Sequence, residues 1–216
     1  LEDILKLREG KLYALFNNGA YGQVSAIEDL PTDALREEFE TNVFAWHELT
    51  IKVLKIMRKQ GYGKIIQNSS VLGLVSLRYK GAYSASKYAI EALSDALRLE
   101  LIDTNIEVSI IEPGPIKSSF RKNAVKSLID KIDYKNSFHY KAYQKAIKKF
   151  EENKKDPFEL EEIAVSQKVL EILNTKKPKA RYFVTTATYL LAFTKRLLST
   201  SLLDKIINKI SGLIFL

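Results

Sequence analysis

The chain has 216 residues with a formal net charge of +8, and 46% of its residues are hydrophobic while 28% are charged. This length suits one domain with a buried core, and the composition is typical of a folded globular protein. The chain contains no cysteine, which excludes disulfides, thiolate metal sites and a cysteine nucleophile and fits a reducing compartment.

The sequence also limits the partners and the cellular location that we expect. The positive charge is spread over amphipathic stretches without a nucleic-acid motif, so we expect no nucleic-acid partner. His47 and His139 have no partners at metal-ligand spacing, so we expect no metal site. Charged residues interrupt residues 1–16, and no run of eighteen apolar residues occurs. We therefore expect neither a signal peptide nor a spanning helix, and a cytoplasmic location.

The first elements are a helix and a strand. Apolar residues at helical spacing predict a helix over residues 1–8, which Gly10 ends. The apolar run Leu12–Phe16 is polar only after its C-terminal edge, where residues 17–20 read Asn-Asn-Gly-Ala. Such a run is typical of a buried strand in a parallel sheet.

The middle of the chain alternates helices with strands. A long helical pattern covers residues 33–58 and contains Asn42, a poor helix former that predicts a break there. We predict a strand over residues 64–68, a helix over 84–103 with apolar residues near a period of 3.6, and a strand over 106–111.

In the last part of the chain, the sequence predicts a variable segment followed by further helices and one strand. Residues 117–157 are rich in lysine and aromatic residues, residues 163–173 predict a helix, and residues 181–185 predict a fourth strand. Residues 187–216 are helical and strongly apolar. Strands that alternate with helices predict right-handed crossovers, and hence one α/β domain over residues 1–216 with a doubly wound, Rossmann-like parallel sheet.

Tyr83 and Lys87 carry the sharpest chemical signal. They are four residues apart at a helix start, so they share one face. A nearby ammonium favours a phenolate and lowers the pKa of the phenol, which then exchanges a proton with a carbonyl or an alcohol near neutral pH. The same spacing also arises by chance on a solvated amphipathic helix, so the pair alone is a weak signal.

Two further polar residues strengthen this interpretation. Ser70 follows the strand at 64–68 and lies thirteen residues before Tyr83, at an end of the sheet where parallel sheets bind ligands. Asn42 interrupts a helical pattern. Each residue also has a plain structural interpretation, Ser70 as a turn residue and Asn42 as a local kink.

Together these residues resemble the short-chain dehydrogenase/reductase family over most of the chain. The order of Asn42, Ser70, Tyr83 and Lys87 is similar to that family's catalytic tetrad. Residues 17–20 resemble its Asn-Asn-Ala-Gly segment with the last two residues exchanged, and residues 113–118 resemble its Pro-Gly segment with Ser in place of Thr. Residues 15–23, 70–74 and 111–116 resemble a bacterial oxidoreductase branch of the family.

The resemblance implies an NAD(P)(H)-dependent oxidoreductase that interconverts an aldehyde or ketone and its alcohol by hydride transfer. Tyr83 would be the general acid and base, Ser70 would bind the substrate oxygen, Lys87 would hold the nicotinamide ribose, and Asn42 would position a water. NADP is the preferred cofactor and NAD the alternative. The residues implied in cofactor binding are Asn17, Gly19, Ala20, Tyr83, Lys87, Pro113, Gly114, Ile116 and Ser118.

One departure from the family pattern leaves an alternative open. Family members begin with a strand and a Gly-rich turn that binds the cofactor pyrophosphate. Here Leu12–Phe16 resembles the fourth strand, so the first three strands and that turn are missing, and we expect that roughly 60–75 residues precede this sequence. If they do not, the alternative is a non-catalytic or membrane-associated remnant without dinucleotide binding.

The remaining expectations concern substrate and partners. Residues 117–157 match the position of the family's substrate lid, and its aromatic residues either enclose a lipophilic carbonyl or alcohol or pack the lid on the core. The family implies a homodimer or homotetramer formed through residues 33–58 and 84–103. The apolar tail at 187–216 carries cations and suits peripheral membrane contact, a cover for the pocket or a subunit contact. Trp46 is expected in the core or at a subunit contact.

Overall fold

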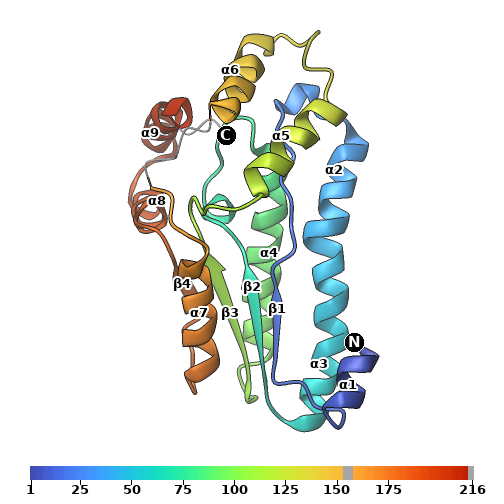
Figure 1. Ribbon diagram of the computed structural model, residues 1–216. Coiled ribbons are helices and arrows are strands. Elements are labelled where there is room, and N and C mark those ends of the chain that lie inside the picture. Colours follow the sequence, from blue (N-terminus) through green and yellow to red (C-terminus); the bar gives the residue numbers. More distant parts are fainter. Residues whose placement is uncertain (153–157, 214–216) are drawn as a thin grey trace.

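The computed structural model describes residues 1–152 and 158–213 and contains a parallel four-stranded sheet with helices on both faces (Figure 1). The strand order is β1-β2-β3-β4, and all three pairings are parallel. This confirms the predicted Rossmann-like α/β fold and its strand positions. The strands are β1 (Ala14–Asn17), β2 (Gly63–Asn68), β3 (Ile106–Glu112) and β4 (Arg181–Phe183).

Neighbouring residues of β2 show how the sheet is covered. Side chains alternate between the two faces of a strand. Ile65 packs in a cluster with Val53 and Met57 of helix α3 (Ala45–Gln60), while Ile66 packs with Ile172 of helix α7 (Ile163–Asn174). Both isoleucines are fully buried. Helix α4 (Gly81–Glu100) covers the same face as α3, and the two faces therefore have separate apolar cores.

The predicted helix over residues 33–58 is continuous but changes its winding in the middle. Helix α2 (Thr32–Phe39) is followed by a π-helical turn, η2 (Glu40–Phe44), and then by α3. Asn42 lies within this turn, so the sequence correctly marks an irregularity at Asn42, but the structure has a wide helical turn there and no break. The other elements are α1 (Glu2–Leu7), the 3₁₀ turns η1 (Ile27–Asp29) and η3 (Val71–Gly73), α5 (Phe120–Lys131), α6 (Tyr140–Glu151), α8 (Thr186–Leu197) and α9 (Thr200–Leu213).

The lid segment forms α5 and α6, while its last residues, 153–157, lie outside the described residues. The aromatic residues of this segment were expected either to enclose the substrate or to pack the lid on the core, and most of them pack on the core. Tyr143 is fully buried in a cluster with Leu128, and Tyr134 and Phe150 pack against that cluster. Phe138, in contrast, is 96% exposed.

The apolar tail forms α8 and α9, which lie beyond β4 and α7 at one side of the molecule (Figure 1). The final residues, 214–216, lie outside the described part of the chain. Within the described residues, every helix is too short or too polar to cross a membrane.

Candidate active site

A cavity of about 600 Å³ opens beyond the carboxyl ends of β1, β2 and β3. Parallel sheets bind ligands at this end because the loops that follow the strands diverge there. The cavity brings together most of the residues that the sequence nominates. Its lining includes Gly19, Ala20, Ser70, Tyr83, Lys87, Pro113, Gly114, Ile116 and Ser118, whereas Asn17 and Asn42 lie outside it.

Tyr83 lies in the first turn of α4 and is 9% exposed. Its ring packs against Phe120, with ring centroids 5.0 Å apart, and Phe120 also lines the cavity. Burial raises the pKa of the phenol, and a hydrogen bond with Ser70 lowers it. The expectation that Lys87 lowers the pKa of Tyr83 is therefore wrong for this structure, since burial has the largest influence and acts in the opposite direction.

Lys87 lies one turn further along α4 and is 1% exposed. Its Nζ donates a hydrogen bond of 2.8 Å to the backbone oxygen of Asn68, at the end of β2, and lies 5.6 Å from the ring centroid of Tyr83. Burial lowers the pKa of Lys87 to about 7, against the opposing charges of Glu38 and Glu91. The amine is therefore poised to gain or lose a proton near neutral pH.

Ser70 is fixed by a cap on the turn that follows β2. Its Oγ accepts a hydrogen bond of 3.1 Å from the backbone nitrogen of Leu72 and so caps η3. The residue is buried and lines the cavity beside Tyr83. Because the cap fixes the side chain, the hydroxyl is held beside Tyr83 at the wall of the cavity.

Asn42 is fully buried and links two segments. Its Oδ1 accepts a hydrogen bond of 3.1 Å from the backbone nitrogen of Tyr21, and its Nδ2 donates to the backbone oxygen of Tyr21 at 2.8 Å. The same Nδ2 donates to the Oγ of Ser86 in α4 at 3.1 Å. The side chain thus ties the chain after β1 to the helix that carries Tyr83 and Lys87. Its expected role in holding a water stays a prediction.

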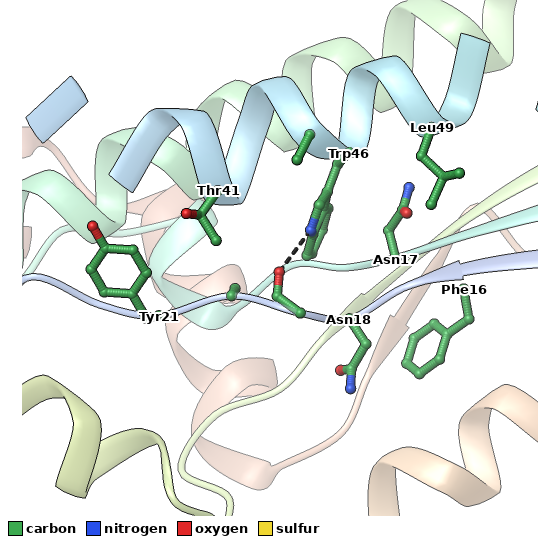
Figure 2. A pocket seen from close by; sticks show the side chains of 10 residues that line it. Phe16, Asn17, Asn18, Tyr21, Thr41, Trp46 and Leu49 are labelled. Atoms are coloured by element: carbon green, nitrogen blue, oxygen red, sulfur yellow. Dashed lines mark hydrogen bonds between the residues drawn. The ribbon is translucent and has the colours of Figure 1, made fainter. Parts of the chain in front are cut away.

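Asn17 faces away from the main cavity. Its Nδ2 donates to the Oγ1 of Thr50 and the Oε1 of Gln67, at 3.1 and 2.9 Å. Figure 2 shows Asn17 directed toward the helix that carries Trp46 and Leu49, while Asn18 points to the opposite side. These residues line a second pocket of about 510 Å³.

Trp46 forms one wall of that second pocket. The ring is buried, and its Nε1 donates a hydrogen bond of 2.8 Å to the backbone oxygen of Gly19, drawn as the dashed line in Figure 2. The indole therefore fixes the segment after β1, which lines both pockets. Trp46 was expected either in the core or at a subunit contact, and its ring is buried within the fold of the single chain.

Glu38 is a functional candidate that sequence reasoning missed. The carboxyl is fully buried on α2 and accepts hydrogen bonds from the backbone nitrogen of Gln23 and from the Nδ2 of Asn42, both at 3.3 Å. Burial raises its pKa to about 8, while the Gln23 hydrogen bond and the charge of Lys87 lower it. The only signal in the sequence is its spacing, four residues before Asn42, which places both on one helix face.

A second buried charge cluster lies beside the cavity. Arg181 of β4 pairs with Glu91 and Asp95 of α4 and with Glu112 of β3, at 2.6 Å to Asp95 and 2.5 Å to Glu112. Burial raises the pKa of Glu91, and it raises that of Glu112 to about 7. The arginine thus joins β3, β4 and α4 beside the loops that line the cavity. Among the described residues, no group of three or more acidic, histidine or cysteine side chains is arranged to hold a metal ion.

The size and lining of the cavity also suit part of a dinucleotide cofactor. Its volume lies within the usual range for cofactor and ligand sites, roughly 300–1,000 Å³. Asn68, which lines it, has a buried Oδ1 without a hydrogen-bond partner among the described residues, so an acceptor is available for a ligand donor. A Cβ at Gly114 would lie 2.2 Å from the Oγ1 of Thr185, so glycine is needed where the cavity wall meets the start of α8.

The sequence of the chain is similar to those of known oxidoreductases, in agreement with the geometry of the site. Residues 2–129 match the short chain dehydrogenase family. The chain is 36% identical over 207 residues to an uncharacterized oxidoreductase, YbbO, of Escherichia coli (strain K12), covering 96% of this chain and 71% of that protein. It is also 36% identical over 214 residues to the NADPH-dependent 3-dehydrocapnine reductase of Ornithobacterium rhinotracheale, covering 97% and 74%.

A solved structure shows the same fold. The crystal structure of a short chain dehydrogenase from Burkholderia cenocepacia J2315 in complex with NADP aligns with a TM-score of 0.70 and 19% identity, covering 95% of this chain and 76% of that one. The fold and the similarity to these proteins together define the protein as an oxidoreductase with a Rossmann-like fold. The chain belongs to the short-chain dehydrogenase/reductase family.

Proposed function

We propose that the protein interconverts a lipophilic aldehyde or ketone and its alcohol by hydride transfer with a nicotinamide dinucleotide. The observation that carries the proposal is the meeting of Ser70, Tyr83 and Lys87 in one cavity, beside the backbone of residues 113–116. A hydroxyl, a phenol and an amine at this end of a parallel sheet are the groups that proton transfer to a carbonyl oxygen requires.

In the proposed reduction, Tyr83 donates its phenolic proton to the substrate oxygen while Ser70 donates a hydrogen bond to the same oxygen. The cofactor supplies the hydride when bound. The pKa of Lys87 is about 7, so this amine can return a proton to Tyr83 afterwards. The buried position of the three groups excludes water and strengthens each electrostatic interaction.

The substrate class follows from the lining of the cavity. Apolar side chains from several elements surround the polar groups, so a lipophilic compound is favoured over a charged one. This lining includes Val71, Leu72, Leu77, Phe120, Val165, Leu191 and Ile210. NADP(H) is the proposed cofactor, with NAD(H) as the alternative, because a relative at 36% identity is named as NADPH-dependent and the chain carries excess positive charge.

We also propose a homodimer or homotetramer in the cytoplasm. Helices α3 and α4 expose large apolar side chains that a symmetric partner would cover. These include Phe44 beside α3, Leu49 and Ile51 on α3, and Leu93 and Leu99 on α4.

An absorbance assay tests the reaction. Purified protein is mixed with NADPH or NADH and a panel of aliphatic and aromatic aldehydes and ketones, and cofactor oxidation is followed. We expect turnover with lipophilic members of the panel and a lower KM for NADPH. Dinucleotide binding is measured separately by calorimetry. No binding and no turnover would favour the alternative of a non-catalytic remnant, and binding without turnover would reject the substrate class.

A further inference from the structure

Helices α8 and α9 expose a row of large apolar side chains. Tyr189, Leu190, Phe193 and Leu197 on α8 and Leu202 on α9 are between 47% and 65% exposed. The α8 residues are one, four and eight positions from Tyr189, so they share one face of the helix. We call these five residues the α8–α9 apolar stripe. Several large apolar side chains exposed on one helix face mark an interaction site.

The stripe is exposed because the opposite face of α8 is docked on the molecule. Thr188, Leu191 and Ala192 are buried, and Leu191 packs in a core cluster with Val71 and Tyr83. The Nζ of Lys195 donates to the backbone oxygen of Leu74 and, at 2.7 Å, to the hydroxyl of Tyr88. Packing and hydrogen bonds therefore fix which face of α8 points outward.

Basic residues accompany the stripe. Between residues 186 and 211 the sequence has four cations and one acid, Asp204. All four are exposed. They are Arg196, Lys205 and Lys209, together with Lys195, whose amine is held by Leu74 and Tyr88. A helix with an apolar face and lysine or arginine beside it lies in the interface of an anionic bilayer, with the apolar side chains among the lipids and the cations at the phosphates.

We propose that the α8–α9 apolar stripe and its cations dock the protein peripherally on an anionic membrane surface. A second copy of the chain is the rival occupant of the stripe. A two-fold contact through this face would bring two copies of Arg196, Lys205 and Lys209 together, and like charges facing each other oppose association. The proposal is independent of the reaction. The two helices also line the cavity through Ala187, Leu191 and Ile210, so the membrane surface and the cavity share one wall.

Vesicle flotation tests the proposal, with phosphatidylcholine vesicles compared with vesicles that also contain phosphatidylglycerol. We expect binding to the anionic vesicles and little to the neutral ones. The double variant Leu190→Ser and Phe193→Ser should weaken binding about tenfold or more, because it removes apolar side chains that insert among the lipids. Ile102→Ser is the matched control, since Ile102 is 74% exposed in the turn after α4, away from the stripe.

A second variant separates charge from apolar contact. Arg196→Glu with Lys209→Glu should remove the preference for anionic vesicles, and circular dichroism checks that all variants fold. Equal binding to both vesicle types, no binding to either, or unchanged binding of the apolar double variant would each overturn the proposal. Light scattering measures the oligomeric state. If the protein does not bind vesicles but forms a dimer that the apolar double variant cannot form, the stripe is the contact with a second copy.

Discussion

The Nζ of Lys87 lies 4.4 Å from the centroid of the Trp46 ring. The amine is thus placed between an aromatic face and the backbone oxygen of Asn68, two partners that favour its charged form, while burial favours the neutral form. Burial lowers the pKa of Lys87 to about 7, and the charges of Glu38 and Glu91 oppose this shift. Trp46 also holds the backbone of Gly19, so one indole ring contacts the amine of Lys87 and fixes the segment that lines both pockets.

Tyr83→Phe should lower kcat by about 10²–10⁴-fold, because it removes the proposed proton donor while the ring that packs against Phe120 remains. The melting temperature and the dissociation constant for NADPH should change little. Steady-state kinetics and calorimetry measure these effects. Tyr62→Phe, at a partly exposed turn, is the control. Turnover retained by the Tyr83 variant would remove this residue from its role.

Glu38→Gln should change the pH dependence of stability. The pKa of Glu38 is about 8 in the folded protein and near its ordinary value of 4.5 when unfolded. Between these values the folded state binds more protons, so the free energy of unfolding of the wild type falls as pH rises, by on the order of 1 kcal/mol per pH unit. The variant lacks this contribution. Relative to wild type, it should therefore be more stable at about pH 7 than at about pH 5.

Urea unfolding at the two pH values measures the Glu38 effect, and Glu40→Gln is the control because Glu40 is exposed two residues away. A stability difference between variant and wild type that stays constant with pH would contradict the assignment.

The sequence predicted the positions of the strands and most of the cavity lining, but it did not predict Glu38. Strands β1 to β3 are apolar runs with polar ends, so both their buried state and the location of the site follow from local pattern. Tyr83, Ser70 and Lys87 lie at the ends of these elements and meet for that reason. Glu38 lies inside a helix whose apolar pattern does not require an acid, and its burial depends on contacts with Gln23 and Asn42.

The error about the pKa of Tyr83 has a related origin. The spacing of Tyr83 and Lys87 correctly predicts a shared helix face, but the amine lies over the ring and bonds to Asn68. Burial sets the direction of the shift, and it comes partly from Leu191 and Phe120, which lie in distant segments whose packing the local pattern does not predict.

Arg181→Met should destabilise the fold by about 3–5 kcal/mol near neutral pH, because Glu91 and Glu112 would remain buried without their cation. The loss should shrink on acidification. The pKa of Glu112 is already raised to about 7, and a protonated carboxyl needs no counter-charge. Urea unfolding at acidic and slightly alkaline pH measures both effects. Arg98→Met, which removes a partly exposed pair with Asp95, should cost far less at either pH.

Gly114→Ala should destabilise the protein by about 1–3 kcal/mol, because the added carbon would clash with the Oγ1 of Thr185. Thr185→Ala alone should cost about 1 kcal/mol, because Thr185 caps α8. The double variant should be more stable than the sum of the two effects predicts, since the second change removes the clashing atom. Gly19→Ala, with open space around it, is the control. Additive losses in thermal unfolding would show that the clash is relieved elsewhere.

The wide turn at Glu40–Phe44 sets the rotational phase between α2 and α3. Each residue advances an α-helix by about 100°, so deleting one residue from this turn would rotate all of α3 by that angle relative to α2. His47 would then occupy the direction of Trp46, and Ile51 that of Thr50. The indole would no longer reach Gly19, and Asn17 would lose its threonine partner. The length of a single helical turn thus determines whether two distant halves of one helix can serve the same site.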